Sequence, residues 1–207
     1  GSSGSPIFLL IGFSQGVAVG AGVVVAQYLG AKDREDAQIA VHTSLAIAAI
    51  LGVVLTVGGI LVCRSLLVWM NTPAEVLEDA VTYMRIYFGG VLFSVIYNMA
   101  AGILNAAGNS QRSLIYLGCA SITNIILDLV LIAGLRMGVE GAAIATDISQ
   151  LVSCILSLRF LMRVEDDYRV TLRKIRPDAK MSARIIRVGL PLSLIHISEP
   201  TRLGMIS

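Results

Sequence analysis

The segment Ile39–Cys63, IAVHTSLAIAAILGVVLTVGGILVC, decides the fold class of this chain because it contains no Asp, Glu, Lys or Arg. A helix that crosses the hydrocarbon core of a membrane needs about 20 consecutive, mostly apolar residues. A buried β-strand has only about 4–8 residues, so the length of this segment excludes a strand. We therefore predict a transmembrane helix over 39–63.

Four other segments meet the same criterion, and they lie at 6–29, 81–107, 114–133 and 139–162. The span at 81–107 is longer and more polar than the others. The expected fold class is all-α: a polytopic membrane helical bundle with five transmembrane helices in residues 1–163. In the first span, small residues recur every four positions, at Gly12, Gly16 and Gly20. Such a ridge lets another helix pack closely in lipid.

The composition supports a membrane protein and excludes several other classes. Charged residues make up 14% of the chain and AVILMFWYC residues 56%, with a mean hydropathy of +0.79. A soluble domain has about 25% charged residues. The hydrophobicity excludes a disordered chain, and a net charge of +2 argues against a nucleic-acid partner. The cysteines lie far apart in apolar runs, which excludes a disulfide scaffold.

Basic residues are distributed unevenly between the two sides of the predicted bundle. One side has twelve, namely Lys32, Arg34, Arg112, Arg159, Arg163, Arg169, Arg173, Lys174, Arg176, Lys180, Arg184 and Arg187. The other has three, namely Arg64, Arg85 and Arg136. Because cytoplasmic connections carry the excess of Lys and Arg, we expect a multi-pass protein of the plasma membrane, in particular a bacterial inner membrane. The C-terminal end is then cytoplasmic, and a first helix is expected to precede the chain.

Residues 164–191 are expected to form a cytoplasmic linker that leads into the next helix. Its apolar residues recur at helical spacing, at Met181, Ile185, Ile186 and Leu190. This pattern predicts an amphipathic helix at the cytoplasmic surface, followed by a new span from 189–191. For Glu165–Lys180, a solvated linker is an equally good interpretation.

A segment at each end of the chain can be interpreted as sequence that is not part of the natural protein. Leu192–Ser207, LSLIHISEPTRLGMIS, resembles the in-frame translation of a transposase-based sequencing adapter, with a genuine tail as the alternative. Such segments are kept out of fold reasoning, so the natural sequence is expected to stop near Pro191. Gly1–Ser5 is either a cloning linker or the small-residue start of the first helix.

Acidic residues inside predicted spans are candidates for function, because a charge at bilayer depth costs at least about 2.5–3.5 kcal/mol on insertion scales. Asp128 lies in the fourth span, and Asn124 shares its helix face one turn earlier. Thr146 lies at a similar depth in the fifth span, which a short connection makes an antiparallel neighbour. We therefore expect these three side chains to meet inside the bundle. Asp147 points about 100° away from Thr146.

Oxygen ligands of this kind bind hard cations, and a desolvated carboxyl can take up and release a proton. The predicted role of Asp128, Asn124 and Thr146 is to bind a coupling ion, H⁺ or Na⁺, with Asp147 as a weaker member of the site. The alternative is a polar clamp between two helices.

No signature of a soluble enzyme is present in the sequence. It lacks a Walker loop, a His-Glu-x-x-His motif, a Cys-x-x-Cys pair and a dinucleotide fingerprint. His42 has no second candidate ligand, so we interpret it as a hydrogen-bonded residue at a helix interface. We expect a protein that is not an enzyme and uses no cofactor.

Five stretches, in order along the chain, resemble the multidrug and toxic compound extrusion (MATE) family. They are VVVAQYLGAKD at 23–33, GILNAAGNSQR at 102–112, NIILD at 124–128, GAAIATDIS at 141–149 and RVGLP at 187–191. The resemblance covers nearly all of 4–191. It implies that the chain holds the second to sixth helices of an N-terminal six-helix lobe, with the linker to the second lobe.

The resemblance implies an antiporter that exports organic cations or drugs in exchange for H⁺ or Na⁺ by alternating access. Asn124, Asp128 and Thr146 fall on the ion-site positions of the family, which also use an Asp from the missing first helix. Asp147 departs from the apolar residue common there. The implied partners are the lipid bilayer, small organic cations and the missing six-helix half, so the chain alone is expected to be inactive.

Three polar residues of the third span, Tyr97, Asn98 and Asn105, are predicted to face the substrate lumen, with helix–helix hydrogen bonding as the alternative. A lipid-linked sugar flippase of related fold is a competing function. It would need cationic residues near the membrane midplane, where this chain has none. An inert truncated membrane fragment is the third interpretation, and it is compatible with an antiporter as the parent protein.

Overall fold

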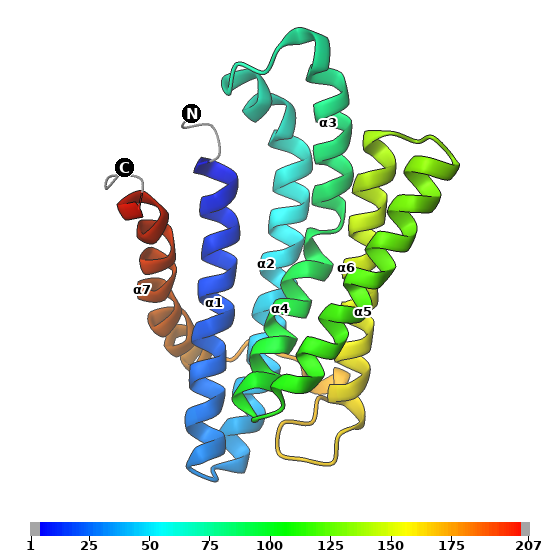
Figure 1. Ribbon diagram of the computed structural model, residues 1–207. Coiled ribbons are helices and arrows are strands. Elements are labelled where there is room, and N and C mark those ends of the chain that lie inside the picture. Colours follow the sequence, from blue (N-terminus) through cyan, green and yellow to red (C-terminus); the bar gives the residue numbers. More distant parts are fainter. Residues whose placement is uncertain (1–4, 204–207) are drawn as a thin grey trace.

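The computed structural model describes residues 5–203, and side chains over 9–195. Four long apolar helices form most of it: α1 (Ser5–Gly30), α2 (Arg34–Trp69), α5 (Ser110–Asp128) and α6 (Val139–Arg163) (Figure 1). A π-helix, η1 (Leu129–Gly134), continues α5, and together they form one candidate span. These helices confirm an all-α membrane bundle. The outermost residues of both chain ends, 1–4 and 204–207, lie outside the described part.

The expected span at 81–107 is divided into two helices in the structure. These are α3 (Ala74–Gly89) and α4 (Val91–Ala106), which meet at Gly90 with a bend of 41°. If the bent pair counts as one crossing, the described chain has five candidate spans instead of four. Adjacent glycines are a common cause of such a kink. The hydropathy pattern alone did not predict this bend, because Gly89 and Gly90 do not interrupt the apolar segment in the sequence.

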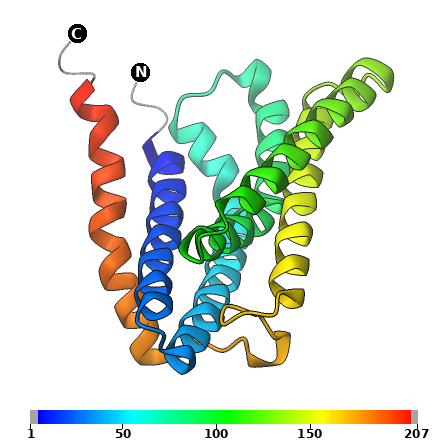
Figure 2. The same cartoon turned by 60° about the horizontal axis from the view of Figure 1, so that its bottom comes forward.

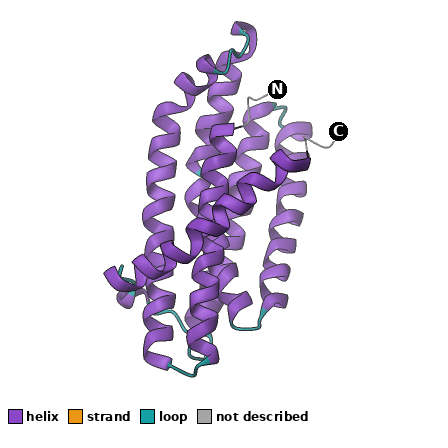
Figure 3. Ribbon diagram, turned by 90° about the vertical axis from the view of Figure 1, so that its left-hand side faces the viewer, coloured by secondary structure: helices purple, strands orange, loops and turns teal. Residues whose placement is uncertain are grey.

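α1 lies between α7 (Ala179–Leu203) on one side and α2 and α4 on the other (Figures 1 and 2). Its fully buried side chains include Val17 and Val24, which belong to the same core as Met99, Ile103 and Leu104 of α4. Short loops join most of the helices (Figure 3). The outer faces of α2 and α5 expose apolar side chains such as Leu61 and Ile122, as lipid-facing surfaces do.

The close contact between α1 and α7 confirms the predicted small-residue ridge. A Cβ atom built at Gly20 would lie 2.6 Å from the Cα of Gly189, and one at Gly16 would lie 2.7 Å from the Cα of Ser193. Real Cβ atoms do not approach other atoms so closely, so only glycine permits this separation of the helix axes. Small residues serve this purpose between membrane helices.

The region expected to be a separate surface helix and then a new span is one continuous helix. α7 passes through Gly189 and Pro191 without interruption. Met181 and Ile185 are buried while Leu190 is 43% exposed, so the predicted amphipathic pattern is used for packing against the bundle. The reason is that the face of α1 with Gly16 and Gly20 lets α7 pack closely against it along the length of α7. The interpretation of 192–207 as non-native stays a prediction.

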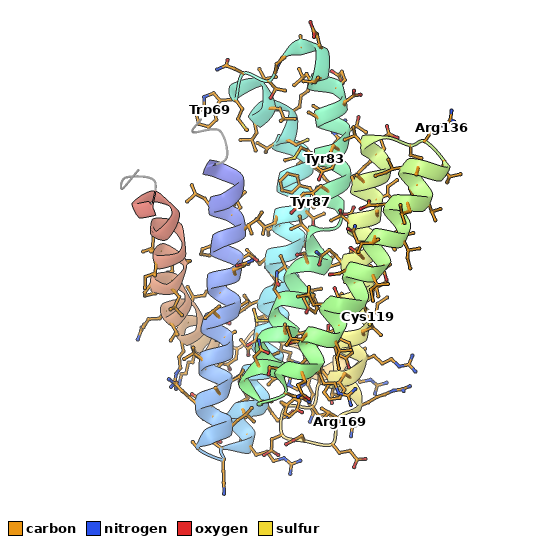
Figure 4. The ribbon with its side chains drawn as sticks, viewed as in Figure 1. Trp69, Tyr83, Tyr87, Cys119, Arg136 and Arg169 are labelled. Carbon is orange, nitrogen blue, oxygen red and sulfur yellow. The ribbon has the colours of Figure 1, made fainter. Side chains whose placement is uncertain are left out.

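The linker 164–178, between α6 and α7, packs beneath the bundle and so differs from a solvated chain. Tyr168 and Val170 are buried, and the backbone N–H of Val170 donates to the carbonyl of Leu161 at 2.9 Å. We call the end of the bundle that holds this linker and the α1–α2 connection the basic end. Arg169 lies there, and Arg136 and Trp69 lie at the opposite end (Figure 4).

Gly20→Ala is predicted to force α1 and α7 apart, because the backbone of Gly189 cannot rotate away from the new methyl group. Overpacking of this kind should lower the free energy of unfolding by about 1–3 kcal/mol. The measurement is the loss of helical circular dichroism on titration with SDS in mixed micelles. Gly58→Ala is the matched control, since nothing lies within 4 Å of its Cβ position. Equal midpoints for the two variants would contradict the close packing.

Candidate functional site

Asp128 is the last residue of α5 and directly precedes the π-helix η1. The wider turn of η1 is visible in its hydrogen bonding: the N–H of Leu135 donates to the carbonyl of Val130 at 2.9 Å. π-helical turns inside longer helices occur frequently at functional sites. The predicted ion-binding carboxylate thus lies where the helical geometry changes.

The carboxylate of Asp128 is incompletely paired. Its Oδ1 atom is buried and has no hydrogen-bond partner. A buried charged oxygen without a donor is strongly unfavourable, so the site fits a bound proton or cation. The assignment of Asp128 as an ion-binding residue, with a polar clamp between two helices as the alternative, stays a prediction.

Asn124 and Thr146 lie on the two helices that form this part of the bundle, and both are half-buried. α5 with η1 and α6 are neighbours, as predicted: a Cβ atom at Gly141 would lie 3.2 Å from the Cβ of Leu131. The hydroxyl of Thr146 donates to the carbonyl of Ala142 at 3.0 Å. That bond uses its proton and leaves its oxygen lone pairs available to a cation.

Within the described chain, no hydrogen bond joins Asn124, Asp128 and Thr146 directly. The structure therefore places the three groups on adjacent helices without linking them to one another. In residues 5–203 there is also no group of three His, Cys, Asp or Glu side chains that could hold a metal ion. Amide, hydroxyl and carboxylate oxygens suit hard cations rather than zinc or copper.

Asp147 lies at a different feature, the bend between α3 and α4. A Cβ atom at Gly90 would overlap the carboxylate of Asp147 and lie 2.9 Å from the Cβ of Asp147. The side chain is half-buried in the notch that Gly90 leaves between the two helices. Its assignment as a weaker member of the Asp128 site stays a prediction, and its contact with Gly90 could not be read from the sequence.

A groove of about 470 Å³ runs between α1 and α4. Asn98 and Asn105 line it, as does Gln15 of α1, and the rest of the lining is Ala, Gly and Val. The two helices approach closely beside it, since a Cβ atom at Gly102 would lie 3.1 Å from the carbonyl oxygen of Ala18. Sequence analysis missed Gln15, although an amide in the middle of an otherwise largely apolar span was a usable signal.

Tyr97, which was predicted to face the lumen, lies inside the bundle and does not line the groove. It is buried, and its hydroxyl donates to the carbonyl of Ser113 on α5 at 2.8 Å. The hydroxyl of Ser113 in turn donates to Oδ1 of Asn105 at 3.0 Å. The alternative interpretation, helix–helix hydrogen bonding, describes Tyr97, and Asn105 both lines the groove and joins α4 to α5.

Comparison with known proteins decides the family. The sequence pattern that defines the MatE family matches residues 2–130, more than half of the chain. The chain belongs to this family. "Probable multidrug resistance protein YoeA" of Bacillus subtilis (strain 168) is 31% identical over 203 residues. The match covers 93% of this chain and 44% of that protein, so the chain spans less than half the length of this MATE relative.

Solved MATE structures confirm the fold. An inward-facing conformation of a multidrug resistance MATE family transporter of the MOP superfamily matches with a TM-score of 0.85 and 34% identity, over 95% of this chain and 45% of that one. An outward-facing conformation matches with a TM-score of 0.86 and 32% identity, over 96% and 44%. This chain is therefore a multi-pass membrane protein, and both of these structural relatives are named as transporters.

Gly90→Ala is predicted to destabilise the bend between α3 and α4, because the new methyl group overlaps Asp147. We expect a loss of about 1–3 kcal/mol in the free energy of unfolding, measured by SDS titration in mixed micelles. Gly89→Ala is the control, since its Cβ position meets only the Asp147 carboxylate at 4.0 Å. Asp147→Ala should recover part of the loss in the Gly90→Ala background. Without any recovery, the contact would not be the cause.

Proposed function

We propose that this chain supplies the N-terminal half of a secondary antiporter that exports organic cations in exchange for H⁺ or Na⁺. The observation that carries the proposal is the buried, unpartnered Oδ1 of Asp128. A proton or a sodium ion would neutralise this carboxylate, and the oxygens of Asn124, one turn earlier on α5, and of Thr146, on the adjacent α6, are suitable further ligands. The site needs no cofactor, and the protein is not an enzyme.

Binding at Asp128 can drive transport only if the two states of the helices bind the ion unequally. A charged carboxylate in lipid favours the arrangement of helices in which it contacts hydrogen-bond donors, cations or water. A neutralised carboxylate tolerates the packing that buries it. The π-helix beside Asp128 gives this segment an alternative to the regular α-helical pattern of backbone hydrogen bonds. The charge of one side chain can therefore select between two arrangements of the helices.

The α1–α4 groove is the proposed contribution of this half to the substrate path. Its lining combines three amides with small apolar residues and includes no Lys or Arg. Such a surface suits amphipathic organic cations. It does not suit a lipid-linked sugar, whose pyrophosphate would require cationic partners. The groove therefore favours drug export over the flippase alternative.

Alternating access in such transporters is largely the rocking of one helix bundle against another. This half resembles an inward-facing and an outward-facing relative equally well, which supports movement of the half as a unit. The second half would complete the path, so we expect no transport by this chain alone. The concentration of Lys and Arg in the linker supports a cytoplasmic basic end, in a bacterial inner membrane.

Asp128→Asn should abolish ion-driven export in a full-length transporter that carries this half. The amide keeps the shape of the side chain but can neither bind a proton nor carry a charge. Export of a fluorescent organic cation from proteoliposomes, driven by a pH gradient or a Na⁺ gradient alone, is the measurement, and the rate should fall to that of protein-free vesicles. Asp79→Asn, at an exposed carboxylate, should export normally. Wild-type export by Asp128→Asn would refute the assignment.

Val19→Trp is predicted to block substrate in the same assay, because Val19 lines the groove and its side chain is 43% exposed. A bulky ring there fills space between α1 and α4. Val53→Trp places the same ring on α2, at a valine that is 49% exposed and outside the groove, and should leave the export rate unchanged. If both variants export at the wild-type rate, the groove is not on the substrate path.

A further inference from the structure

Three arginines lie at the basic end of the α5–α6 pair, and all three side chains are exposed. Arg112 belongs to the first turn of α5, and Arg159 and Arg163 belong to the last turns of α6. The two helices pack against each other, and the guanidinium of Arg112 lies 5.1 Å from the centre of the Phe160 ring on α6. We call Arg112, Arg159 and Arg163 the arginine cluster.

Helical geometry places Arg159 and Arg163 on one side of Phe160. At about 100° per residue, Arg163 lies roughly 60° around α6 from Phe160, and Arg159 lies roughly 100° away in the same sense. The ring of Phe160 faces α5, where its centre lies 6.4 Å from that of Tyr116. The two arginines of α6 therefore stand beside the contact between the helices and not within it.

The faces of α5 and α6 that carry the arginines expose apolar side chains further into the membrane. On α6, Ile148 and Ile155 are exposed, and Ile155 lies one turn before Arg159. On α5, the exposed Ile115 lies one turn after Arg112. An exposed apolar stripe that ends in a long basic side chain is typical of a lipid-facing helix at the level of the headgroups.

The positive charge of the arginine cluster is not neutralised by its own helices. Among the described side chains, 9–195, none of the three forms an ion pair or a side-chain hydrogen bond. On α6, the acid nearest to Arg159 is Asp147, 12 residues away, which is roughly 18 Å along a helix. On α5, Asp128 lies 16 residues from Arg112, or roughly 24 Å.

The acids of the linker 164–178 are matched by other basic residues. One groove holds its acidic and basic side chains together, and it is lined by Glu165, Asp166, Asp167, Arg34, Arg169 and Lys174. Asp167 pairs with Arg34 at 3.2 Å, and the Asp166 carboxylate accepts from the N–H of Asp167 at 2.8 Å. The exposed Arg173 and Arg176 add further positive charge to the linker.

Two other acids of the basic end serve as helix caps. The carboxylate of Asp33 accepts from the N–H of Asp36 at the start of α2, and that of Asp178 accepts from the N–H of Met181 at the start of α7. Neither α2 nor α7 makes more than a marginal contact with α5 or α6. The arginine cluster thus keeps an excess of positive charge at the membrane surface.

We propose that the arginine cluster and the apolar faces next to it bind an anionic phospholipid from the leaflet at the basic end. Guanidinium groups form paired hydrogen bonds with phosphate oxygens, and basic sites between membrane helices bind anionic headgroups. The Phe160 ring holds the guanidinium of Arg112 by a cation–π contact. The acyl chains lie along Ile115 and Ile155. A soluble phosphate compound would use only the arginines, whereas a phospholipid fits both parts of the surface.

The lipid site is separate from Asp128 and goes beyond the proposed transport function. A headgroup bound by Arg112 of α5 and by Arg159 of α6 would connect the ends of the two helices that carry the proposed ion site. Its binding is measured without transport, so failure of the lipid site is distinguishable from failure of the antiporter proposal.

Native mass spectrometry of the 207-residue chain in detergent micelles tests the site. The chain is titrated with phosphatidylglycerol, whose net charge is negative, and separately with phosphatidylcholine of the same acyl chains, whose net charge is zero. We expect the first phosphatidylglycerol to bind more than about tenfold more tightly, since each arginine near an anionic headgroup contributes about fivefold. Soluble glycerol 3-phosphate should not displace the bound lipid.

Substitutions locate the site. Arg159→Gln should weaken phosphatidylglycerol binding about fivefold, and Arg159→Gln combined with Arg163→Gln about 25-fold, with phosphatidylcholine binding unchanged. Two matched controls also remove one exposed arginine each: Arg136→Gln at the opposite end of the bundle (Figure 4) and Arg173→Gln in the linker. Both should bind phosphatidylglycerol as the wild type does.

Several results would overturn the proposal. Equal affinity of the wild-type chain for the two lipids would do so without any variant. Wild-type affinity of the folded double variant, or an equal loss in Arg173→Gln, would show that the preference reflects overall charge and not the arginine cluster. Displacement by glycerol 3-phosphate would show a site for soluble phosphate compounds instead of a lipid.

Discussion

The close approach of helix backbones at glycine is the constraint on which the rest of the structure depends. In lipid there is no hydrophobic force between helices, so association relies on packing and hydrogen bonding. α1 contacts α7 through Gly20 and Gly189, and it contacts α4 through Gly22 and Gly102. The contact of Gly22 with Gly102 borders the α1–α4 groove. A Cβ atom at Gly102 would lie 3.1 Å from the carbonyl oxygen of Ala18, so a side chain there would push α1 and α4 apart.

Polar side chains in the spans fall into two groups according to whether they carry a proton to donate. Several hydroxyl groups donate within their own helix: Ser44 donates to the carbonyl of Ala40, and Thr123 donates to that of Cys119. Ser and Thr commonly bond to the preceding turn in this way. A carboxylate has no proton and finds no donor there. The buried Oδ1 of Asp128 has no such partner in the described chain, and this is the reason for proposing that it binds an ion.

At the basic end, side-chain contacts add to the connections of the chain. Arg184 lies 4.8 Å above the ring of Tyr28 and bonds to Gln27, which joins α7 to the end of α1. Arg34 and Gln38 contact Asp167, and His42 contacts Thr171, which joins the linker 164–178 to α2. These polar contacts can exchange with water at a membrane surface, whereas the glycine contacts between helices cannot.

The sequence by itself determined the all-α membrane class and the approximate positions of the four long apolar helices α1, α2, α5 and α6, since a segment of this length and apolarity crosses a bilayer as a helix. It also determined the shared face of Asn124 and Asp128, because helical periodicity is local, and it carried the family resemblance. Only the tertiary structure decided the bend at Gly90, the contact of Asp147 with that bend and the partner of Tyr97. The bond between His42 and Thr171 joins residues 129 positions apart. Such contacts depend on how distant segments pack, and no local pattern of residues records that packing.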